Sequence, residues 1–174
     1  MTETVAPNAD WEIVFYPDKR LRLQAEPITE ITDEIRKRGL ALMDLMHVAK
    51  GIGLAAPQVG WSVRLLAINL SGQRRDGLIF LNPVIERQSK ATFAAEEACL
   101  SLPRISGKVT RPREVTITAM NMDGELNRFE LDGMLARCFL HEYDHLDGIL
   151  FIDHLSPAKK QAIKGKLKKL GGPE

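Results

Sequence analysis

The sequence is poor in cysteine and in net charge, and each shortage excludes a class of protein. Only 2 of the 174 residues are cysteine. These are too few for a disulfide-stapled secreted scaffold, so we expect free thiols in a reducing compartment. The 24 basic and 23 acidic residues leave a net charge of +1. So small a charge gives no reason to expect a sequence-specific nucleic-acid partner.

Long apolar runs are also absent. No stretch approaches the roughly 20 apolar residues that cross a bilayer, so no membrane partner is expected. Residues 1–10 carry two acids and no apolar run, which argues against a secretion signal and an Arg-rich transit peptide. These absences predict a cytoplasmic protein.

The composition that remains is that of an ordinary soluble protein. Hydrophobic residues make up 44% of the chain and charged residues 27%, both usual for a globular domain. At this length one domain can bury a large core. No repeat, low-complexity tract or linker divides the chain, so we expect one catalytic domain over residues 1–174.

The spacing of apolar residues predicts helices that begin at Thr32, near Gly133 and at Ser156, with extended segments between them. We expect a bulge or a sheet edge at Pro83, and the segment with Cys99 to end at Pro103. The expected extended segments are residues 11–16, 62–70, 78–86, 93–102, 114–121 and 125–131. Because hairpin-like connections join them, the predicted class is α+β. Antiparallel strands would pack around a central helix, with an N-terminal and a C-terminal helix besides.

An H-E-x-x-H pattern, His141-Glu142-Tyr143-Asp144-His145, lies within the predicted central helix. Two histidines four residues apart lie on one helical face, with Cβ atoms about 6 Å apart, so both imidazoles can reach one ion. Glu142 is placed to take a proton from water at that ion and later to return it. The alternative is a helix with two partly buried histidines, because so short a pattern recurs by chance.

A catalytic site of this kind needs a third protein ligand. A metzincin would have histidine where this chain has Phe151, and a thermolysin-like enzyme would need a glutamate downstream, where only Glu174 follows. His154 is out of register. Cys138 lies about 10 Å along the helix from His145, which is too far for one ion, so we interpret it as a core or pocket residue.

Cys99 remains as the candidate third ligand. It lies in an extended segment after two acids and before a proline, and packing alone does not explain it. One thiolate and two imidazoles would form a soft site suited to zinc or iron.

A small, apolar segment at residues 51–60 is the second unusual stretch. Its glycines allow another chain to approach closely, which favours a loop that faces substrate. The alternative is a buried connector between helix and strand. It lacks the lysine of a phosphate-binding loop, so that interpretation is excluded.

Three motifs together resemble the signature motifs of the peptide deformylase family. They are Gly51-Ile52-Gly53-Leu54-Ala55-Ala56-Pro57-Gln58, Glu97-Ala98-Cys99-Leu100-Ser101 and His141-Glu142-Tyr143-Asp144-His145-Leu146. Their order and spacing match, and the likeness extends from about Val14 to Pro157.

Carried over position by position, the resemblance implies a role for each matching residue. The metal ligands would be Cys99, His141 and His145, and Glu142 would be the general base and acid. Gln58 and the backbone N–H of Leu100 would face the formyl oxygen. Residues expected to line the methionine pocket are Ile52, Met134 and Cys138, and those beside the peptide backbone are Gly53, Glu97 and Ala98.

The resemblance further implies the reaction and its partners. A metal-activated water would remove the N-formyl group from formyl-methionine at the start of nascent chains and release formate. One divalent ion per chain is expected, with Fe²⁺ as the active ion and Zn²⁺, Ni²⁺ or Co²⁺ as substitutes that a purified sample can carry. The lysine-rich segment at about residues 157–172 is by default a solvated basic helix, and the resemblance suggests ribosome docking as its alternative role.

Two positions depart from the family pattern. Ala98 stands where the family has glycine, and it would crowd a peptide or strain the backbone only if its φ were positive. Leu140 stands where the family usually has glutamine, before the first histidine, which removes a side chain that could hydrogen-bond near the metal. Neither change touches Glu142, Gln58 or an implied ligand, so we expect a working deformylase. Ala98 keeps open a related amidohydrolase with another substrate preference. A non-catalytic metal-binding or ribosome-associated homologue is a separate alternative.

Overall fold

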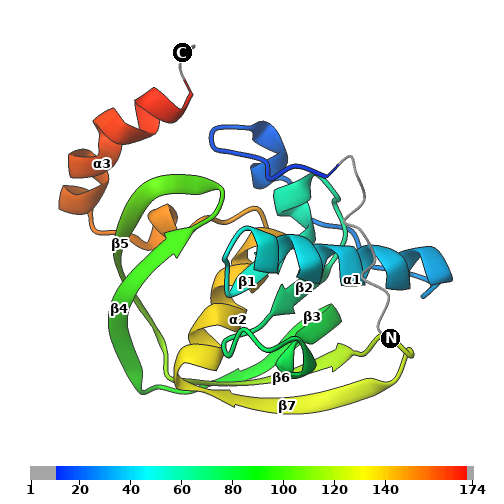
Figure 1. Ribbon diagram of the computed structural model, residues 1–174. Coiled ribbons are helices and arrows are strands. Elements are labelled where there is room, and N and C mark those ends of the chain that lie inside the picture. The colour runs from blue at the N-terminus through cyan, green and yellow to red at the C-terminus, as the bar shows by residue number, and fades with distance from the viewer. Residues whose placement is uncertain (1–10, 172–174) are drawn as a thin grey trace.

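The structure is a computed structural model that describes residues 11–171 (Figure 1). The segment at residues 1–10, for which we predict no secretion signal, lies outside the described residues. No helix in the described part of the chain is both long and apolar enough to cross a membrane.

A five-stranded antiparallel sheet forms one layer, with the strand order β1-β2-β3-β6-β7. Its strands are β1 (Gly53–Ala55), β2 (Leu65–Ile68), β3 (Leu78–Gln88), β6 (Glu114–Met120) and β7 (Leu126–Asp132). The register of β3 against β6 shifts between Leu81 and Val84. The bulge expected at Pro83 is therefore confirmed.

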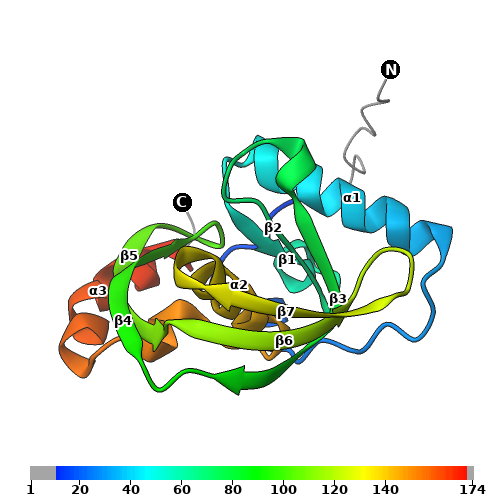
Figure 2. The same ribbon diagram turned by 90° about the horizontal axis from the view of Figure 1, so that it is seen from below.

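One helix covers each face of this sheet. Alternate residues of β2 face opposite ways: Leu66 and Ile68 pack in the cluster that contains α2 (Gly133–Leu146). Leu65 and Ala67 pack in the cluster that contains α1 (Asp33–Val48). Period-two alternation with apolar residues on both faces is what a strand buried between two helices requires. The sheet therefore holds α2 firmly in the interior (Figures 1 and 2).

A separate two-stranded hairpin lies on the other side of α2, made of β4 (Thr92–Cys99) and β5 (Leu102–Pro112). Its apolar residues Leu102, Ile105 and Val109 join Ile163 of the C-terminal helix α3 (Pro157–Leu170) in a third core cluster. Short 3-10 helices complete the chain, at Lys19–Arg22, Ala56–Val59, Arg74–Asp76 and Phe151–His154.

Local capping chemistry sets the helix starts. The Thr32 side chain accepts a hydrogen bond from the N–H of Ile35 at the start of α1, and Ser156 does the same for Lys159 at the start of α3. Such caps satisfy N–H groups that a helix leaves unpaired. The three predicted helices are confirmed, and so is the α+β class with antiparallel strands around a central helix.

One boundary prediction is wrong. We expected the segment with Cys99 to end at Pro103, but β4 ends at Cys99, the chain turns at Leu100 and Ser101, and Pro103 lies inside β5. Proline lacks an N–H, yet within residues 11–171 β5 pairs with β4 alone, so the other side of β5 needs no donor for a further strand.

Candidate metal centre

Three potential ligand atoms converge where β4 meets α2. The ligand atoms of Cys99, His141 and His145 all lie within 4.8 Å of one another. Cys99 Sγ is 3.4 Å from His145 Nε2, and the two imidazole centroids are 5.3 Å apart. Helix geometry places the two histidines one turn apart, and a register shift between Ala98 and Cys99 ends the regular pairing of β4 at the thiol.

These residues fit a divalent ion. Ligands at about 2.3 Å for sulfur and about 2.0 Å for nitrogen lie roughly 3.5 Å apart in a tetrahedron, close to the observed Sγ–Nε2 distance. All three side chains are buried. Three protein ligands would leave one position for water or substrate, as in catalytic rather than structural sites.

Glu97 orients the first histidine from behind. Its Oε2 lies 3.0 Å from His141 Nδ1. With Nδ1 bonded to the carboxylate, Nε2 is the nitrogen left for an ion, and such a contact fixes the tautomer and ring orientation of a ligand. The Glu97 side chain is therefore turned inward, so only its backbone is left to lie beside a peptide, the place expected from the sequence.

Two buried arginines hold Glu97 in turn. Arg111 donates to both carboxylate oxygens, at 2.6 and 2.9 Å, and Arg137 donates to Oε1 at 2.7 Å. Burial raises the pKa of Glu97, but hydrogen bonds from His141 and Arg111 outweigh this and lower the pKa to about 2. Glu97 is therefore a permanent carboxylate near neutral pH.

Arg137 also ties the hairpin to the helix. It donates to the carbonyl oxygens of Val109 on β5 and Phe93 on β4, at 2.9 and 2.6 Å, and its guanidinium lies 4.3 Å from the Phe93 ring centroid. Arg137 precedes His141 by four residues, so it lies one turn away on the same helix face. These contacts hold the hairpin that carries the cysteine against the helix that carries the two histidines.

The two histidines differ in protonation without an ion. Burial lowers the pKa of His141, but contacts with Cys99 and Glu97 outweigh burial and raise the pKa well above the usual value. Burial and the nearby His141 lower the pKa of His145 well below it. Because ligand nitrogens must be deprotonated, an ion held here would need a neutral His141, and its affinity would therefore depend on pH.

Glu142 lies beside the ligands as an unpaired carboxylate. It is 4% exposed, and its Oε2 has no hydrogen-bond partner among the described residues. Burial is the main reason that the pKa of Glu142 rises to about 7. A group with this pKa and a free oxygen is suited to exchange protons near neutral pH.

Gln58 lies on the opposite side of the cysteine. Its Nε2 donates to Cys99 Sγ at 3.4 Å and to Ser101 Oγ at 3.1 Å, while its Oε1 accepts from the N–H of Ala55. The amide is 1% exposed and its orientation is fixed by these partners. Leu100 follows Cys99 in the turn between β4 and β5.

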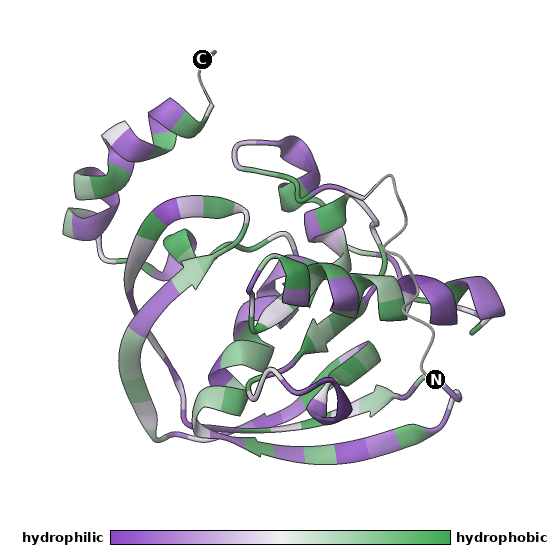
Figure 3. Cartoon of the chain, in the orientation of Figure 1, coloured by the Kyte–Doolittle hydropathy of each residue, from purple (hydrophilic) through white to green (hydrophobic). Residues whose placement is uncertain are grey.

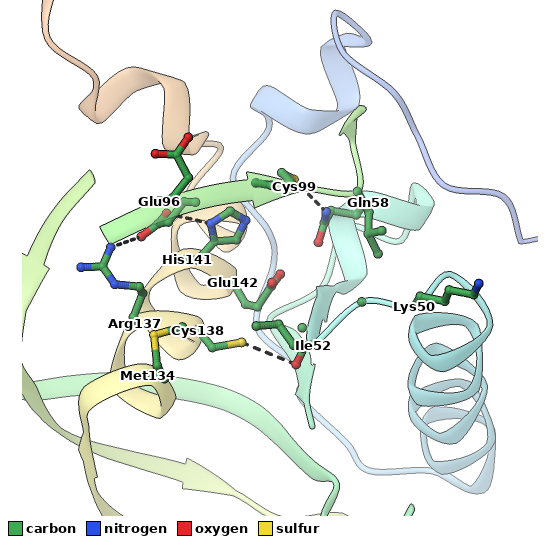
Figure 4. Close-up of a pocket in the computed structure, with 15 residues that line it drawn as sticks. Lys50, Ile52, Gln58, Glu96, Cys99, Met134, Arg137, Cys138, His141 and Glu142 are labelled. Atoms are coloured by element: carbon green, nitrogen blue, oxygen red, sulfur yellow. Dashed lines mark hydrogen bonds and ion pairs between the residues drawn. The ribbon is translucent and has the colours of Figure 1, made fainter. Parts of the chain in front are cut away.

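A cavity of about 340 Å³ opens in front of this cluster (Figure 4). In Figure 4, Glu142 lies between Cys138 and Met134 on one side and Lys50 on the other. The residues named from the sequence that line the cavity are Ile52, Gly53, Gln58, Glu97, Ala98, Cys99, Leu100, Met134, Cys138, His141 and Glu142. His145 lies behind them in the cluster.

The structure also answers the question raised at Ala98. Non-glycine residues with positive φ in the described chain are Lys50, Asn82 and Arg104, so Ala98 does not need a glycine conformation. Its side chain is exposed at the cavity wall. Leu140 is buried in the α2 core and provides no hydrogen bond near the metal site.

Comparisons with known proteins agree with this arrangement. A family model described as polypeptide deformylase matches residues 11–161. A peptide deformylase of Acinetobacter baumannii (strain SDF) is 44% identical over 158 residues, which are 91% of this chain and 90% of that protein. The chain belongs to the polypeptide deformylase family.

Solved structures of deformylases share its architecture. A peptide deformylase of Plasmodium falciparum is 39% identical with a TM-score of 0.89, over 91% of this chain and 94% of that chain. One of Legionella pneumophila is 37% identical with a TM-score of 0.87, over 92% and 95%. The resemblance noted in the three motifs therefore extends to the fold as a whole.

Sequence reasoning missed four residues of this deformylase site. Arg111 and Arg137 hold Glu97, while Lys50 and Glu96 line the cavity. The position of Arg137, one helical turn before His141, was a usable signal. No signal in the sequence indicated Arg111, because its contact with Glu97 depends on the register of a strand that was not predicted.

Proposed function

We propose that this chain is a metal-dependent hydrolase that removes the N-formyl group from the N-terminal formyl-methionine of newly made polypeptides. The observation that carries the proposal is the unpaired carboxylate of Glu142 beside the Cys99, His141 and His145 cluster. A purely structural ion would need no such group. Membership of the deformylase family supports the same reaction.

Each side chain then has a task in the hydrolysis. A divalent ion at the cluster would act as a Lewis acid on the formyl oxygen and lower the pKa of water at the site. Glu142 takes a proton from that water while the water oxygen forms a bond to the formyl carbon. Glu142 then passes the proton to the amine nitrogen as the C–N bond breaks. The products are formate and a peptide with a free N-terminus.

Negative charge that develops on the formyl oxygen needs donors. The Nε2 of Gln58 is held at the ligand sulfur by a long contact of 3.4 Å, which it can exchange for a bond to substrate. The Leu100 N–H is the second proposed donor. Loss of one donor of this kind typically raises the barrier by about 3 kcal/mol.

The apolar end of the cavity suits the methionine side chain. Ile52, Met134 and Cys138 line it, and Met134 and Ile52 are about half exposed at its opening. Flexible sulfur-containing side chains pack well against methionine. Near the reacting centre Gly53 lies against Glu142, which leaves little room for an acyl group larger than formyl.

Formate release from formyl-Met-Ala tests the function, with acetyl-Met-Ala and formylated non-methionine peptides as competitors. We expect turnover of the formyl-Met peptide to exceed all others. Preference for another acyl group or first residue would support the alternative amidohydrolase. A wild-type protein that binds metal and releases no formate would support the non-catalytic alternative.

Fe²⁺ is the proposed active ion, and Zn²⁺, Ni²⁺ or Co²⁺ can take its place. The soft thiolate and imidazole set accepts all four. An oxidisable ion beside a thiolate predicts activity that is lost in air and preserved by a reductant. Equal activity of anaerobic and aerated enzyme would contradict the iron proposal.

We propose that the protein is cytoplasmic, that its chain forms one catalytic domain, and that nascent chains are its partners. Helix α3 is the proposed contact with the ribosome. Its colouring is largely hydrophilic in Figure 3, and Ile163 anchors it in the core. Its exposed lysines are Lys159, Lys160, Lys164, Lys166, Lys168 and Lys169. Replacing them with glutamine while keeping Ile163 should weaken salt-sensitive co-sedimentation with ribosomes. Unchanged co-sedimentation would rule this contact out.

A further inference from the structure

Lys50 places an unpaired positive charge on the wall of the substrate cavity. It follows the C-cap of α1, its side chain is exposed, and it lines the cavity opposite Met134 (Figure 4). The ammonium forms no ion pair with any acid among residues 11–171. The charge is therefore available to a ligand.

The backbone at Lys50 is unusual for a lysine. Its φ is +58°, in the left-handed region that glycine and asparagine adopt most readily. Glycine follows at position 51, so the turn out of α1 has the permissive residue one place later. Strain of this kind is concentrated at functional sites.

The chain from Gly53 to Lys50 leads away from the reacting centre. Gly53 lies against the carboxylate of Glu142, as judged from the position that its Cβ would occupy. Even a fully extended chain rises only about 3.3 Å per residue, so Lys50, three residues before Gly53, lies no more than about 10 Å from that point. The second and third residues of an extended peptide whose formyl group is at Glu142 reach a similar distance. Their side chains can therefore meet the Lys50 ammonium.

The shape of the surface favours a bound peptide that runs past Lys50. A second cavity of about 320 Å³ shares Lys50, Gly51 and Ile52 with the first, so the hollow continues past Lys50. The exposed charged residue on the other wall, Glu96, already accepts a hydrogen bond from Ser106 Oγ at 2.7 Å. A charged side chain on the peptide thus finds a free partner at Lys50 and an engaged one at Glu96.

We propose that Lys50 is a specificity-determining residue that favours formyl-methionyl peptides with an acidic side chain at the second or third position. The proposal rests on the proposed deformylase function. Lys50 would attract the carboxylate and repel a lysine at the same place. A partly exposed pair gives a modest effect, which salt weakens.

The test compares kcat/KM for formyl-Met-Ala-Glu-Ser and formyl-Met-Ala-Lys-Ser, and for the pair with the charge at position two. Wild type should prefer the acidic peptide by roughly threefold at low ionic strength, and Lys50→Glu should reverse the preference, a change of about tenfold in the ratio. The ratio within each variant cancels any general loss of activity. Both preferences should fade toward 0.5 M salt, because the Debye screening length falls to about 4 Å there.

Lys37→Glu is the matched control, because Lys37 is an exposed lysine of α1 that does not line the cavity. It makes the same change in net charge and should leave the ratio as in wild type. An equal shift in the control, or a ratio that Lys50→Glu leaves unchanged, would overturn the proposal while the deformylase function stands. Failure of wild type to release formate from any of these peptides would instead refute the function itself.

Discussion

Glu97 Oε2 lies 3.0 Å from Nδ1 of His141, and the same carboxylate accepts hydrogen bonds from Arg111 and Arg137. Glu97 is on β4, two residues before Cys99, whereas His141 is on α2. The contact therefore links the two elements that supply the proposed ligands. A site arranged in this way loses little entropy when the ion binds.

Glu97→Gln should weaken metal binding by about 10- to 100-fold, the usual effect of losing a carboxylate behind a ligand histidine. The neutral amide no longer favours the orientation with Nε2 toward the ion, and it leaves two buried arginines with less charge to balance them. Competition with a chromophoric chelator would measure the change in affinity.

Glu96→Gln is the control for that experiment. Glu96 is adjacent in sequence, but it is exposed and its carboxylate bonds only to Ser106 Oγ among the described residues. We expect its metal affinity to equal that of wild type. If both variants bound metal as wild type does, Glu97 would have no role in positioning His141.

The acid stability of the metal-free protein should depend on Glu97. Its pKa is about 2 in the fold against an ordinary value of 4.5, so the unfolded chain binds more protons between these values. Its contribution, about 3 kcal/mol, is therefore present above pH 4.5 and is lost as the pH falls to 2. Urea midpoints measured from pH 2 to 7 should show this loss in wild type and a smaller one in Glu97→Gln. Equal pH dependence in both would contradict the shifted pKa.

Most of the fold could be predicted from local signals. Caps at Thr32 and Ser156, together with periodic apolar residues, located all three helices. β5 could not be predicted, because Pro103 looks like a strand end when its pairing partner is unknown. An edge position, which permits proline, is a property of the assembled sheet and not of the local sequence.

Only those site residues that belong to recognisable sequence motifs could be predicted. The spacing of His141 and His145 indicates an ion by helix geometry alone, and Cys99 was the thiol left after other ligands were excluded. The arginines that balance Glu97 come from β5 and from a helix turn without a motif. Their role follows from burial, since a carboxylate removed from water needs partners.

Gly53→Ala should reduce activity far more than stability. A Cβ at position 53 would lie 2.8 Å from Cδ of Glu142, so the carboxylate would have to turn away from the cluster. A displacement near 1 Å at a reacting group can lower the rate about 100-fold. We expect a loss of that order in kcat/KM for formyl-Met-Ala, with metal content unchanged.

Gly165→Ala is the matched substitution on α3, where an added Cβ meets nothing within 4 Å. It should keep full activity and stabilise the protein by up to about 1 kcal/mol, because alanine favours a helix. A loss of activity as large as in Gly53→Ala would show that any added methyl is harmful. The inference about Glu142 would then fail.

Glu142 should set the acidic limb of the pH–rate profile. Burial raises its pKa to about 7 in the metal-free protein, and a nearby cation favours the charged form and moves the pKa down. Because the base works as a carboxylate, kcat/KM should fall tenfold per pH unit below an apparent pKa of about 7 or lower. Glu142→Gln should remove this limb, lower kcat/KM by about 100- to 10,000-fold, and keep its ion by elemental analysis. Turnover near the wild-type rate in that variant would refute the assignment of Glu142 as base, whereas loss of the ion would make it a ligand instead.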